Sequence, residues 1–156
     1  MIQGKDMCVR PAKESDLSAW ASMRSQLWPD CADQHVAELE AYFAGSSIDI
    51  EQCFVVDGPA ADLIGFMELN IRNFAEGSRQ AAVPYVEAWY IKPAYQGQGL
   101  GSQLIQQGEL WARKLGYDEL ASDTETDNHK SIAMHQHLGF EEIERVVCFL
   151  KKLKHE

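Results

Sequence analysis

Residues 84–111 read PYVEAWYIKPAYQGQGLGSQLIQQGELW, and this stretch decides the fold. Aromatic and β-branched residues dominate its first part and predict a strand over residues 83–92. After Pro93, apolar residues recur at helical spacing from Leu100 and predict an amphipathic helix that ends at Gly116. A strand, a glycine-rich connection and a helix therefore follow one another here.

The connection runs from Gln96 to Gly101 with the sequence Gln-Gly-Gln-Gly-Leu-Gly. Glycines between a strand and a helix allow a tight turn and expose successive N–H groups at the helix N-terminus. These groups and the helix dipole attract a pyrophosphate. The spacing QxxGxG is neither a Walker loop, since no Gly-Lys-Ser/Thr follows, nor the Rossmann order GxGxxG. A phosphate cradle is expected, with a flexible connection as the alternative.

Strand-like and helical segments fill the rest of the chain. Further strands are expected at residues 7–11, 53–56, 63–72, 119–122, 140–143 and 146–150. Helices are expected from a cap at Ser15 to Pro29, from a cap at Asp33 to Phe43, and up to about Leu138, where Gly139 stops the last one. This order predicts an α/β fold with one mixed central β-sheet flanked by helices. At 156 residues, a single domain is expected.

The charge balance limits the partners. Lys and Arg number 14 against 24 Asp and Glu, which gives a formal net charge of −10. Phosphate binding needs a basic face, so no nucleic-acid partner is expected and a cationic ligand is favoured. No apolar run reaches the roughly 20 residues of a membrane span. No apolar signal segment opens the chain, so no membrane partner and a cytoplasmic location are expected.

Neither the cysteines nor the histidines predict a metal site. The four cysteines are scattered without a CxxC pair, and no HExxH pattern occurs. His135 and His137 are two residues apart and point to different faces of a helix. The cysteines are expected to be small buried hydrophobic residues, and no metal cofactor is expected.

Two carboxylates stand at conspicuous strand positions. Glu87 lies inside an otherwise apolar strand, where an unpaired charge costs on the order of several kcal/mol. Under strict alternation, its face also carries Val83, Tyr85, Trp89 and Ile91. Glu87 is therefore expected either to act on a ligand or to lie at an edge in solvent. Asp123 follows the strand at 119–122, where ligands of open α/β sheets collect; its alternative role is a helix cap.

Acidic residues are unevenly distributed along the chain. Residues 25–71 contain no Lys or Arg but nine acids: Asp30, Asp33, Glu38, Glu40, Asp49, Glu51, Asp57, Asp62 and Glu68. Such a one-sided field attracts polycations, although a merely solvating surface is the alternative. Trp28 is expected to offer a flat wall to a sugar or amine, or else to belong to the core. Asn128 is expected to contact a ligand or to cap a helix.

These residues resemble the Gcn5-related N-acetyltransferase (GNAT) superfamily. The similarity rests on the strand 85–92, the loop 96–101, Asn128 and the ending Leu138-Gly139-Phe140. Within the superfamily, the chain resembles the bacterial aminoglycoside 6′-N-acetyltransferases from Met7 onward. The closer markers are Gln26-Leu27-Trp28-Pro29, Ile71-Arg72, Glu87, Ala121-Ser122-Asp123-Thr124 and residues 138–146. The acetyltransferase domain is therefore expected over 7–156, with 1–6 an N-terminal extension or alternative start.

The resemblance also implies residue roles. Backbone groups of Trp89, Tyr90 and Ile91 would bind the pantetheine and thioester of acetyl-CoA. Its pyrophosphate and the rest of coenzyme A would be held by Gln96, Gly97, Gln98, Gly99, Leu100, Gly101, Ser102 and Asn128. The aminoglycoside site would be lined by Trp28, Phe74, Glu87, Asp123 and Glu144. Phe74 stands where relatives carry tyrosine, so no hydroxyl contact is expected there. His135 stands where many relatives have a tyrosine acid, so either His135 or water would protonate the thiolate.

The implied reaction is direct transfer of the acetyl group of acetyl-CoA to the 6′-amino group, with aminoglycoside resistance as the consequence. An amine attacks only when deprotonated and a thioester is already activated, so no covalent enzyme intermediate is expected. Glu87 and Asp123 are expected to be the catalytic residues. They would position the cationic amine, and one of them would accept its proton through water.

Two other functions stay open on this evidence. An acidic pocket also suits a polyamine or another small amine as the acetyl acceptor. A non-catalytic acyl-CoA-binding module is the other alternative, against which Glu87 and Asp123 argue. The apolar residues of the last strand are expected to pair across a homodimer, as in relatives. Glu144 would then serve its own site or that of the partner.

Overall fold

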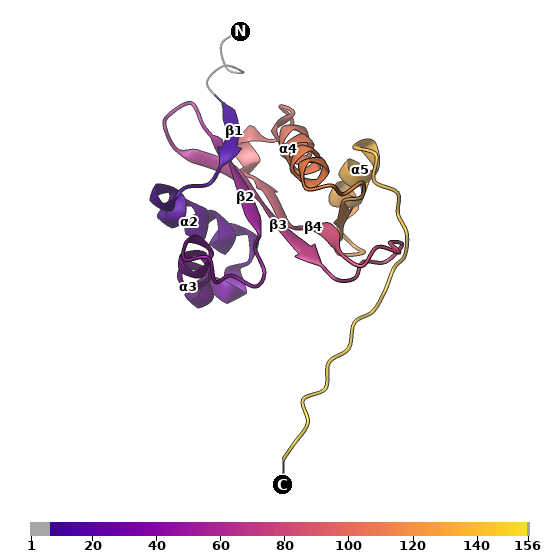
Figure 1. Cartoon of the computed structure of the whole chain (residues 1–156). Helices are drawn as coiled ribbons and strands as arrows, with labels where there is room; N and C mark the ends of the chain where they lie inside the picture. The colour runs from indigo at the N-terminus through magenta and orange to yellow at the C-terminus, as the bar shows by residue number, and fades with distance from the viewer. Residues whose placement is uncertain (1–6, 156) are drawn as a thin grey trace. The chain divides into compact units, whose positions relative to one another are not determined.

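The computed structural model describes residues 7–155, apart from the side chains of residues 31 and 32. The proposed extension at 1–6 lies outside the described residues. The chain forms two compact units, one up to Asp123 and one from Thr124 onward, and each is described by itself. Helices and strands of the first unit are drawn in indigo to orange in Figure 1.

A five-stranded sheet forms the centre of the first unit. Its strands are β1 (Cys8–Pro11), β2 (Gln52–Asp57), β3 (Leu63–Arg72), β4 (Val83–Ile91) and β5 (Ala121–Ser122). They lie side by side in chain order. Each of the first three strands is antiparallel to the next, whereas β5 runs parallel to β4, so the sheet is mixed. The five expected strands of this unit are confirmed to within two residues.

Helices cover both faces of this sheet (Figure 1). They are α2 (Leu17–Leu27), α3 (Ala32–Phe43) and α4 (Leu100–Lys114), with short 3₁₀ turns η1 (Glu14–Asp16), η2 (Pro29–Cys31) and η3 (Pro93–Tyr95). Trp20 of α2 and Leu39 of α3 pack in one core cluster with Phe66 of β3. Gly108 of α4 lies against Met67, the neighbour of Phe66 that points to the opposite face. The sheet is therefore enclosed between α2 and α3 on one side and α4 on the other.

The helix starts differ slightly from expectation. Ser15 does not cap α2: the 3₁₀ turn η1 precedes it, and Asp16 occupies the N-cap position without a side-chain cap bond. Asp33 lies within the first turn of α3 rather than at its cap. The end of α4 is as expected, because Gly116 follows the C-cap Leu115 with φ +93°.

A β-bulge interrupts β4 at Glu87. Glu68 pairs with Ala88, but the next residue, Leu69, pairs with Val86, so Glu87 is an extra residue in the ladder. After the bulge, Ala88 belongs to the core cluster under α2 and α3, whereas Trp89 lies against Gly101 of α4. The expectation that Glu87 shares its face with Trp89 and Ile91 is therefore wrong, because the extra residue reverses the alternation.

The second unit contains helix α5 (His129–His137) and the chain that follows it. Asn128 is the N-cap of α5, and its side chain accepts a hydrogen bond from the Ser131 N–H at 3.1 Å. The expected strands at 140–143 and 146–150 are wrong for this structure, which has no regular secondary structure after Gly139 in its described residues. A strand needs a neighbouring strand to pair its backbone groups, and this unit contains none in its described part.

Two expectations about side chains can be compared with the structure. Cys53 is buried as expected, but Cys8 and Cys148 are exposed, because neither belongs to the packed core. Among residues 7–155, no cluster of three or more His, Cys, Asp or Glu side chains could hold a metal ion. Within the same residues, no helix combines the length and the apolar character needed to cross a bilayer.

Candidate active site

The strands β4 and β5 part at a defined point. Their parallel pairing consists of Tyr85 with Ala121 and Val86 with Ser122. The next residues, Glu87 and Asp123, are the two carboxylates singled out in the sequence. Since parallel partners run in the same direction, both carboxylates follow the last paired position at the same end of the sheet. The structure thus brings Glu87 and Asp123 to one place.

Beyond this point, β4 continues to Ile91 while β5 has ended. In the described structure the β5 ladder therefore does not reach Trp89, Tyr90 or Ile91. On its other edge, β4 stays paired with β3 as far as Ile91. An extended ligand with amide groups can add to such an edge as a strand would.

The loop after β4 has the geometry of an anion cradle. Gly97 and Gly99 adopt φ values of +82° and +83°, which side chains disfavour, and an added Cβ would meet no atom within 4 Å at either. Gly99 is the N-cap of α4. The first N–H groups of a helix lack intrahelical partners, so the 15-residue α4 presents them at this loop.

Two side-chain hydrogen bonds hold this loop in place. Gln96 donates through Nε2 to the carbonyl oxygen of Ile91 at 2.9 Å. The indole N–H of Trp89 donates to the carbonyl oxygen of Gly101 at 3.1 Å. Both bonds join the end of β4 to the loop and the start of α4.

Glu87 is held by the guanidinium of Arg72, which the sequence analysis named only as part of the marker Ile71-Arg72 and gave no role in the site. Arg72, at the end of β3, donates from Nε and from an η nitrogen to the two carboxylate oxygens, each at 2.7 Å. The amide of Asn70 lies 3.4 Å from one of these oxygens. This pairing raises the pKa of Arg72 above its usual range. Glu87 is therefore neither a solvent-exposed edge residue nor an unpaired buried charge.

Asp123 is held through a tyrosine. The hydroxyl of Tyr85 donates to Asp123 Oδ2 at 2.7 Å. Burial of the phenol, and then this hydrogen bond, raise the pKa of Tyr85 above its usual range, so it stays protonated as a donor. The guanidinium carbon of Arg72 lies 3.6 Å from the centroid of the Tyr85 ring. One arginine thus contacts Glu87 directly and Asp123 through the tyrosine.

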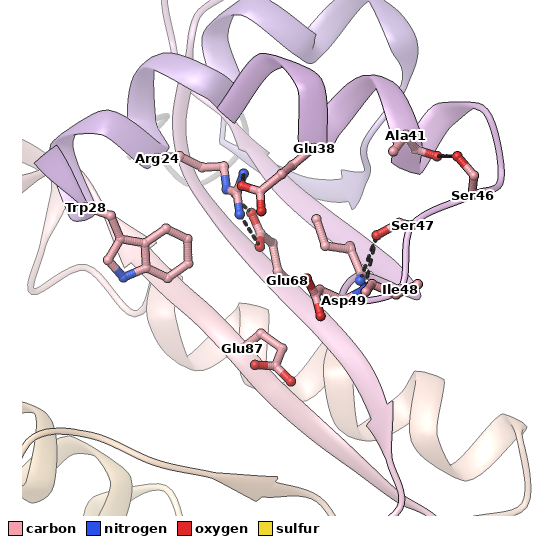
Figure 2. A pocket seen from close by; sticks show the side chains of 11 residues that line it. Arg24, Trp28, Glu38, Ala41, Ser46, Ser47, Ile48, Asp49, Glu68 and Glu87 are labelled. Carbon is pink, nitrogen blue, oxygen red and sulfur yellow. Dashed lines mark hydrogen bonds and ion pairs between the residues drawn. The ribbon is translucent and has the colours of Figure 1, made fainter. Parts of the chain in front are cut away.

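A pocket of about 320 Å³ opens beside Glu87 on the α2 and α3 side of the sheet (Figure 2). Four of its lining residues are acidic and one is basic. The lining residues are Arg24, Trp28, Glu38, Ala41, Ser46, Ser47, Ile48, Asp49, Ile50, Glu68 and Glu87. Such an excess of carboxylates favours a cationic ligand.

The single cation of this pocket is locked between two carboxylates, as Figure 2 shows. Arg24 lies 3.0 Å from Glu38 Oε1 and, through Nε, 2.9 Å from Glu68 Oε2. Glu68 is 1% exposed and also accepts a hydrogen bond of 2.9 Å from the indole of Trp20. Burial raises the pKa of Glu68 to about 7, although Arg24 opposes the shift.

Trp28 forms another wall of the pocket. It is the C-cap residue of α2 and is partly buried. The guanidinium carbon of Arg24 lies 5.1 Å from its ring centroid, within the range of a cation–π contact. Of the two alternatives for Trp28, the structure favours the wall of a pocket, although the ring also borders the core.

The remaining predicted residues are distributed differently. Phe74, in the loop after β3, is 63% exposed and does not line this pocket. Ser102 lies in the first turn of α4. Asn128 and Glu144 belong to the second unit, in which Asn128 is a helix cap and Glu144 is exposed. Their roles stay predictions.

Sequence reasoning missed Arg24, Arg72, Tyr85 and Glu68 as parts of this site. A signal for the two arginines was present in the sequence. Arg24 and Arg72 directly flank the acid-rich stretch 25–71, which lacks any Lys or Arg. Glu68 carries the same signal as Glu87, a carboxylate inside an apolar strand. Tyr85 gave no signal, since tyrosine is ordinary in a strand.

The mixed sheet and the glycine-rich loop at the N-terminus of α4 agree with the expectation of an acetyltransferase fold. The model of the Acetyltransferase (GNAT) family matches residues 18–140, and the chain belongs to this family. The expected GNAT-like α/β fold is thereby confirmed.

Curated relatives narrow the similarity further. The chain is 37% identical to "Aminoglycoside N(6′)-acetyltransferase type 1" of Klebsiella aerogenes, over 93% of this chain and 96% of the relative. It is 36% identical to the protein of the same name from Acinetobacter baumannii, over 94% and 99% of the two chains.

Solved structures agree with these relatives. The aminoglycoside antibiotic 6′-N-acetyltransferase AAC(6′)-Ih from Acinetobacter baumannii matches with a TM-score of 0.85 and 35% identity, over 95% of this chain and 99% of that one. AAC(6′)-Iy in complex with the bisubstrate analogue CoA-S-monomethyl-acetylneamine matches with a TM-score of 0.84 and 33% identity, over 94% and 99%.

Proposed function

We propose that this protein transfers the acetyl group of acetyl-CoA to the 6′-amino group of aminoglycosides and thereby confers resistance to them. The observation that carries the proposal is the acidic pocket that reaches Glu87, at the point where β4 and β5 part. The names of the curated relatives and of the bisubstrate complex support the same acceptor.

The loop and the β4 edge fit acetyl-CoA, which supplies an activated thioester. Gly97 and Gly99 turn the chain with positive φ, and the N-terminus of α4 offers N–H groups for the pyrophosphate. The backbone of Trp89, Tyr90 and Ile91 would receive the pantetheine arm along the edge that β5 leaves uncovered. Gln96, Gln98, Leu100, Gly101, Ser102 and Asn128 complete the proposed cofactor-binding set.

The carboxylates act on the amine. Glu87 and Asp123 attract the ammonium group, and Trp28 provides a flat wall for the sugar. Asp123 is the better candidate to accept the amine proton through water, because both oxygens of Glu87 already accept hydrogen bonds from Arg72. Phe74 and Glu144 remain proposed substrate contacts.

The thiolate must be protonated after transfer. His135 Nδ1 lies 2.7 Å from the carbonyl oxygen of Ser131, so this nitrogen carries a proton and donates. His135 could then give a proton only from Nε2 of the imidazolium form, with water as the alternative acid.

We also propose a cytoplasmic homodimer. Apolar side chains of the terminal segment, residues 143–153, are largely exposed: Ile143, Val146, Val147, Phe149, Leu150 and Leu153. Pairing of this segment with a second copy would cover them and provide the strand partner that it lacks. The segment carries Glu144, so Glu144 would act in its own site or in that of the partner. Light scattering of the full chain distinguishes a dimer from a monomer.

A direct assay tests the proposed function. Thiol release from acetyl-CoA is measured with kanamycin or tobramycin, and in parallel with spermidine. Turnover with the aminoglycosides, and acetylation at the 6′-amino group by mass spectrometry and NMR, support the proposal. Turnover with spermidine alone favours the polyamine alternative. Coenzyme A binding without turnover on any amine favours a binding module.

A further inference from the structure

Arg72 places a positive charge inside a site whose proposed substrate is a polycation. Its guanidinium binds Glu87 through two hydrogen bonds of 2.7 Å. The Arg72 side chain is 39% exposed and that of Glu87 19%, so the pair lies at the boundary of the site rather than in the core. A cation at this position competes with the ammonium group of the substrate for Glu87. The presence of Arg72 in the site therefore needs a chemical explanation.

The same guanidinium also influences the second carboxylate. It lies over the ring of Tyr85 at 3.6 Å, and the hydroxyl of that ring donates to Asp123 at 2.7 Å. Four side chains from β3, β4 and the end of β5 thus form a continuous series: Glu87, Arg72, Tyr85 and Asp123. Arg72 is the member that contacts two residues of β4, Glu87 and Tyr85.

The chemistry of the acceptor gives the reason. An amine attacks a thioester only in its neutral form, and primary ammonium groups hold their proton strongly near pH 7. Two carboxylates beside the amine stabilise the ammonium form further, because opposite charges favour the charged state. An acidic pocket alone would therefore bind the substrate well and keep its nucleophile protonated.

A nearby guanidinium opposes this effect. An amine that donated to Glu87 would lie about two hydrogen-bond lengths, roughly 6 Å, from the Arg72 guanidinium. At that separation, partly screened by solvent, one positive charge lowers the pKa of an amine by about one unit. Arg72 remains charged throughout, because its pairing with Glu87 raises its own pKa.

We propose that Arg72 is a positioning residue that fixes Glu87 and Tyr85 and increases the fraction of the bound acceptor amine that is in the neutral, nucleophilic form. This inference rests on the proposed acetyl transfer to an aminoglycoside. It assigns two different tasks to the charges of the site, since the carboxylates of the pocket bind the polycation while Arg72 prepares one of its amines for attack.

Other charged or titratable groups act on the same place and must stay constant in a test. They are Glu68 on β3, Tyr85 and Glu87 on β4, Glu76 in the loop after β3, Asp123 after β5, and, around the pocket, Arg24, Glu38 and Asp49. None of them is changed when Arg72 alone is replaced.

The test compares the pH dependence of kcat for the full-length wild-type chain, Arg72→Gln and Arg72→Lys, with kanamycin and saturating acetyl-CoA. In Arg72→Gln, the rise of kcat with pH is expected to move about one unit upward. This predicts a roughly tenfold loss at neutral pH that is recovered at alkaline pH. Arg72→Lys keeps the positive charge but loses the pair of guanidinium hydrogen bonds to Glu87. Its pH profile is expected to coincide with that of the wild type.

Glu87→Gln provides the opposite change. It removes the carboxylate between Arg72 and the amine, so the profile is expected to move to lower pH, which tests the inference even if Arg72→Gln does not fold. Calorimetric binding of coenzyme A, expected to be unchanged, confirms that each variant is folded.

Coincident profiles of Arg72→Gln and wild type would overturn the inference, as would an equal shift in Arg72→Lys or an unmoved profile in Glu87→Gln. In these cases Arg72 merely joins β3 to β4. A wild-type chain without turnover on any aminoglycoside would overturn the proposed function, and this inference with it, before any variant is compared.

Discussion

Val86 and Ser122 form the last pair of the parallel ladder between β4 and β5, and the residue that follows each of them is a carboxylate. The end of the ladder therefore sets the spacing of Glu87 and Asp123, whereas their surroundings differ. Glu87 is the extra residue of a bulge and is paired with Arg72, while Asp123 accepts a hydrogen bond from Tyr85.

Because Asp123 is not paired with Arg72, we expect removal of its charge to affect proton transfer from the amine directly. Asp123→Asn is expected to lower kcat with an aminoglycoside by about 10²–10³-fold, because a general base contributes on that order. Binding of acetyl-CoA is expected to persist, since the loop at 96–101 is unchanged. Steady-state kinetics and calorimetry measure the two effects. Unchanged turnover would exclude Asp123 as the proton acceptor.

Tyr85→Phe removes the hydroxyl that orients Asp123 and leaves the ring under Arg72. We expect kcat to fall about tenfold and the free energy of unfolding by about 1 kcal/mol, the usual net contribution of such a hydrogen bond. The double variant with Asp123→Asn is the control. If Tyr85 acts through Asp123, the two kcat effects are not additive. Additive losses would show that Tyr85 acts independently.

Most of the sheet could be predicted because its signals are local. Apolar runs gave β2, β3 and β4 to within about one residue, and glycines marked both the loop and the end of α4. The bulge at Glu87 was not predictable from period-two alternation, since an extra residue is visible only in the register with β3. The expected strands after Gly139 failed for a similar reason, because apolar composition does not supply a pairing partner.

In the site, too, features with a local sequence signal could be predicted, whereas contacts between different elements could not. Glu87, Asp123 and the glycine loop were singled out as candidates from their positions within single elements. The pairs Arg72–Glu87 and Arg24–Glu68 join different elements of the sheet and helices, so no local pattern contains them. The distribution of charge along the chain is the sequence feature that comes closest to predicting these pairs, because Arg24 and Arg72 flank the stretch without basic residues.

The backbone of the loop leads to a prediction with a matched control. Gly99→Ala is expected to lower the free energy of unfolding by about 1 kcal/mol, because its φ of +83° is strained for alanine, and to weaken coenzyme A binding. Gly101→Ala is the control: its added Cβ meets the ring of Trp89 at 3.4 Å, an ordinary contact. Thermal unfolding and calorimetry measure both. Equal losses of stability in the two variants would contradict this explanation.

Trp28 is expected to affect the acceptor and not the cofactor. Trp28→Ala removes the wall over Arg24 and is expected to raise the aminoglycoside KM about tenfold, a loss typical of one aromatic contact. The KM of acetyl-CoA should stay unchanged. Trp28→Phe keeps a ring and should lie between the two. If the KM of acetyl-CoA rises instead, the pocket in Figure 2 is not the acceptor site.

Glu68 predicts a pH dependence of stability with a definite sign. Burial raises its pKa in the folded state from 4.5 to about 7, so the folded chain holds this proton more tightly than the unfolded chain. The resulting stabilisation is full below pH 4.5 and is lost as the pH rises through 7. The loss amounts to about 3 kcal/mol.

Glu68→Gln cannot titrate, but its amide oxygen can still accept the hydrogen bond from Trp20. Urea unfolding between pH 4.5 and 8 measures both chains. The free energy of unfolding of the wild type, relative to Glu68→Gln, is expected to fall by that amount across this range, while other titrating groups cancel in the difference. Parallel curves would show that Arg24 keeps Glu68 ionised at all of these pH values, and that the carboxylate is a permanent charge in the floor of the pocket.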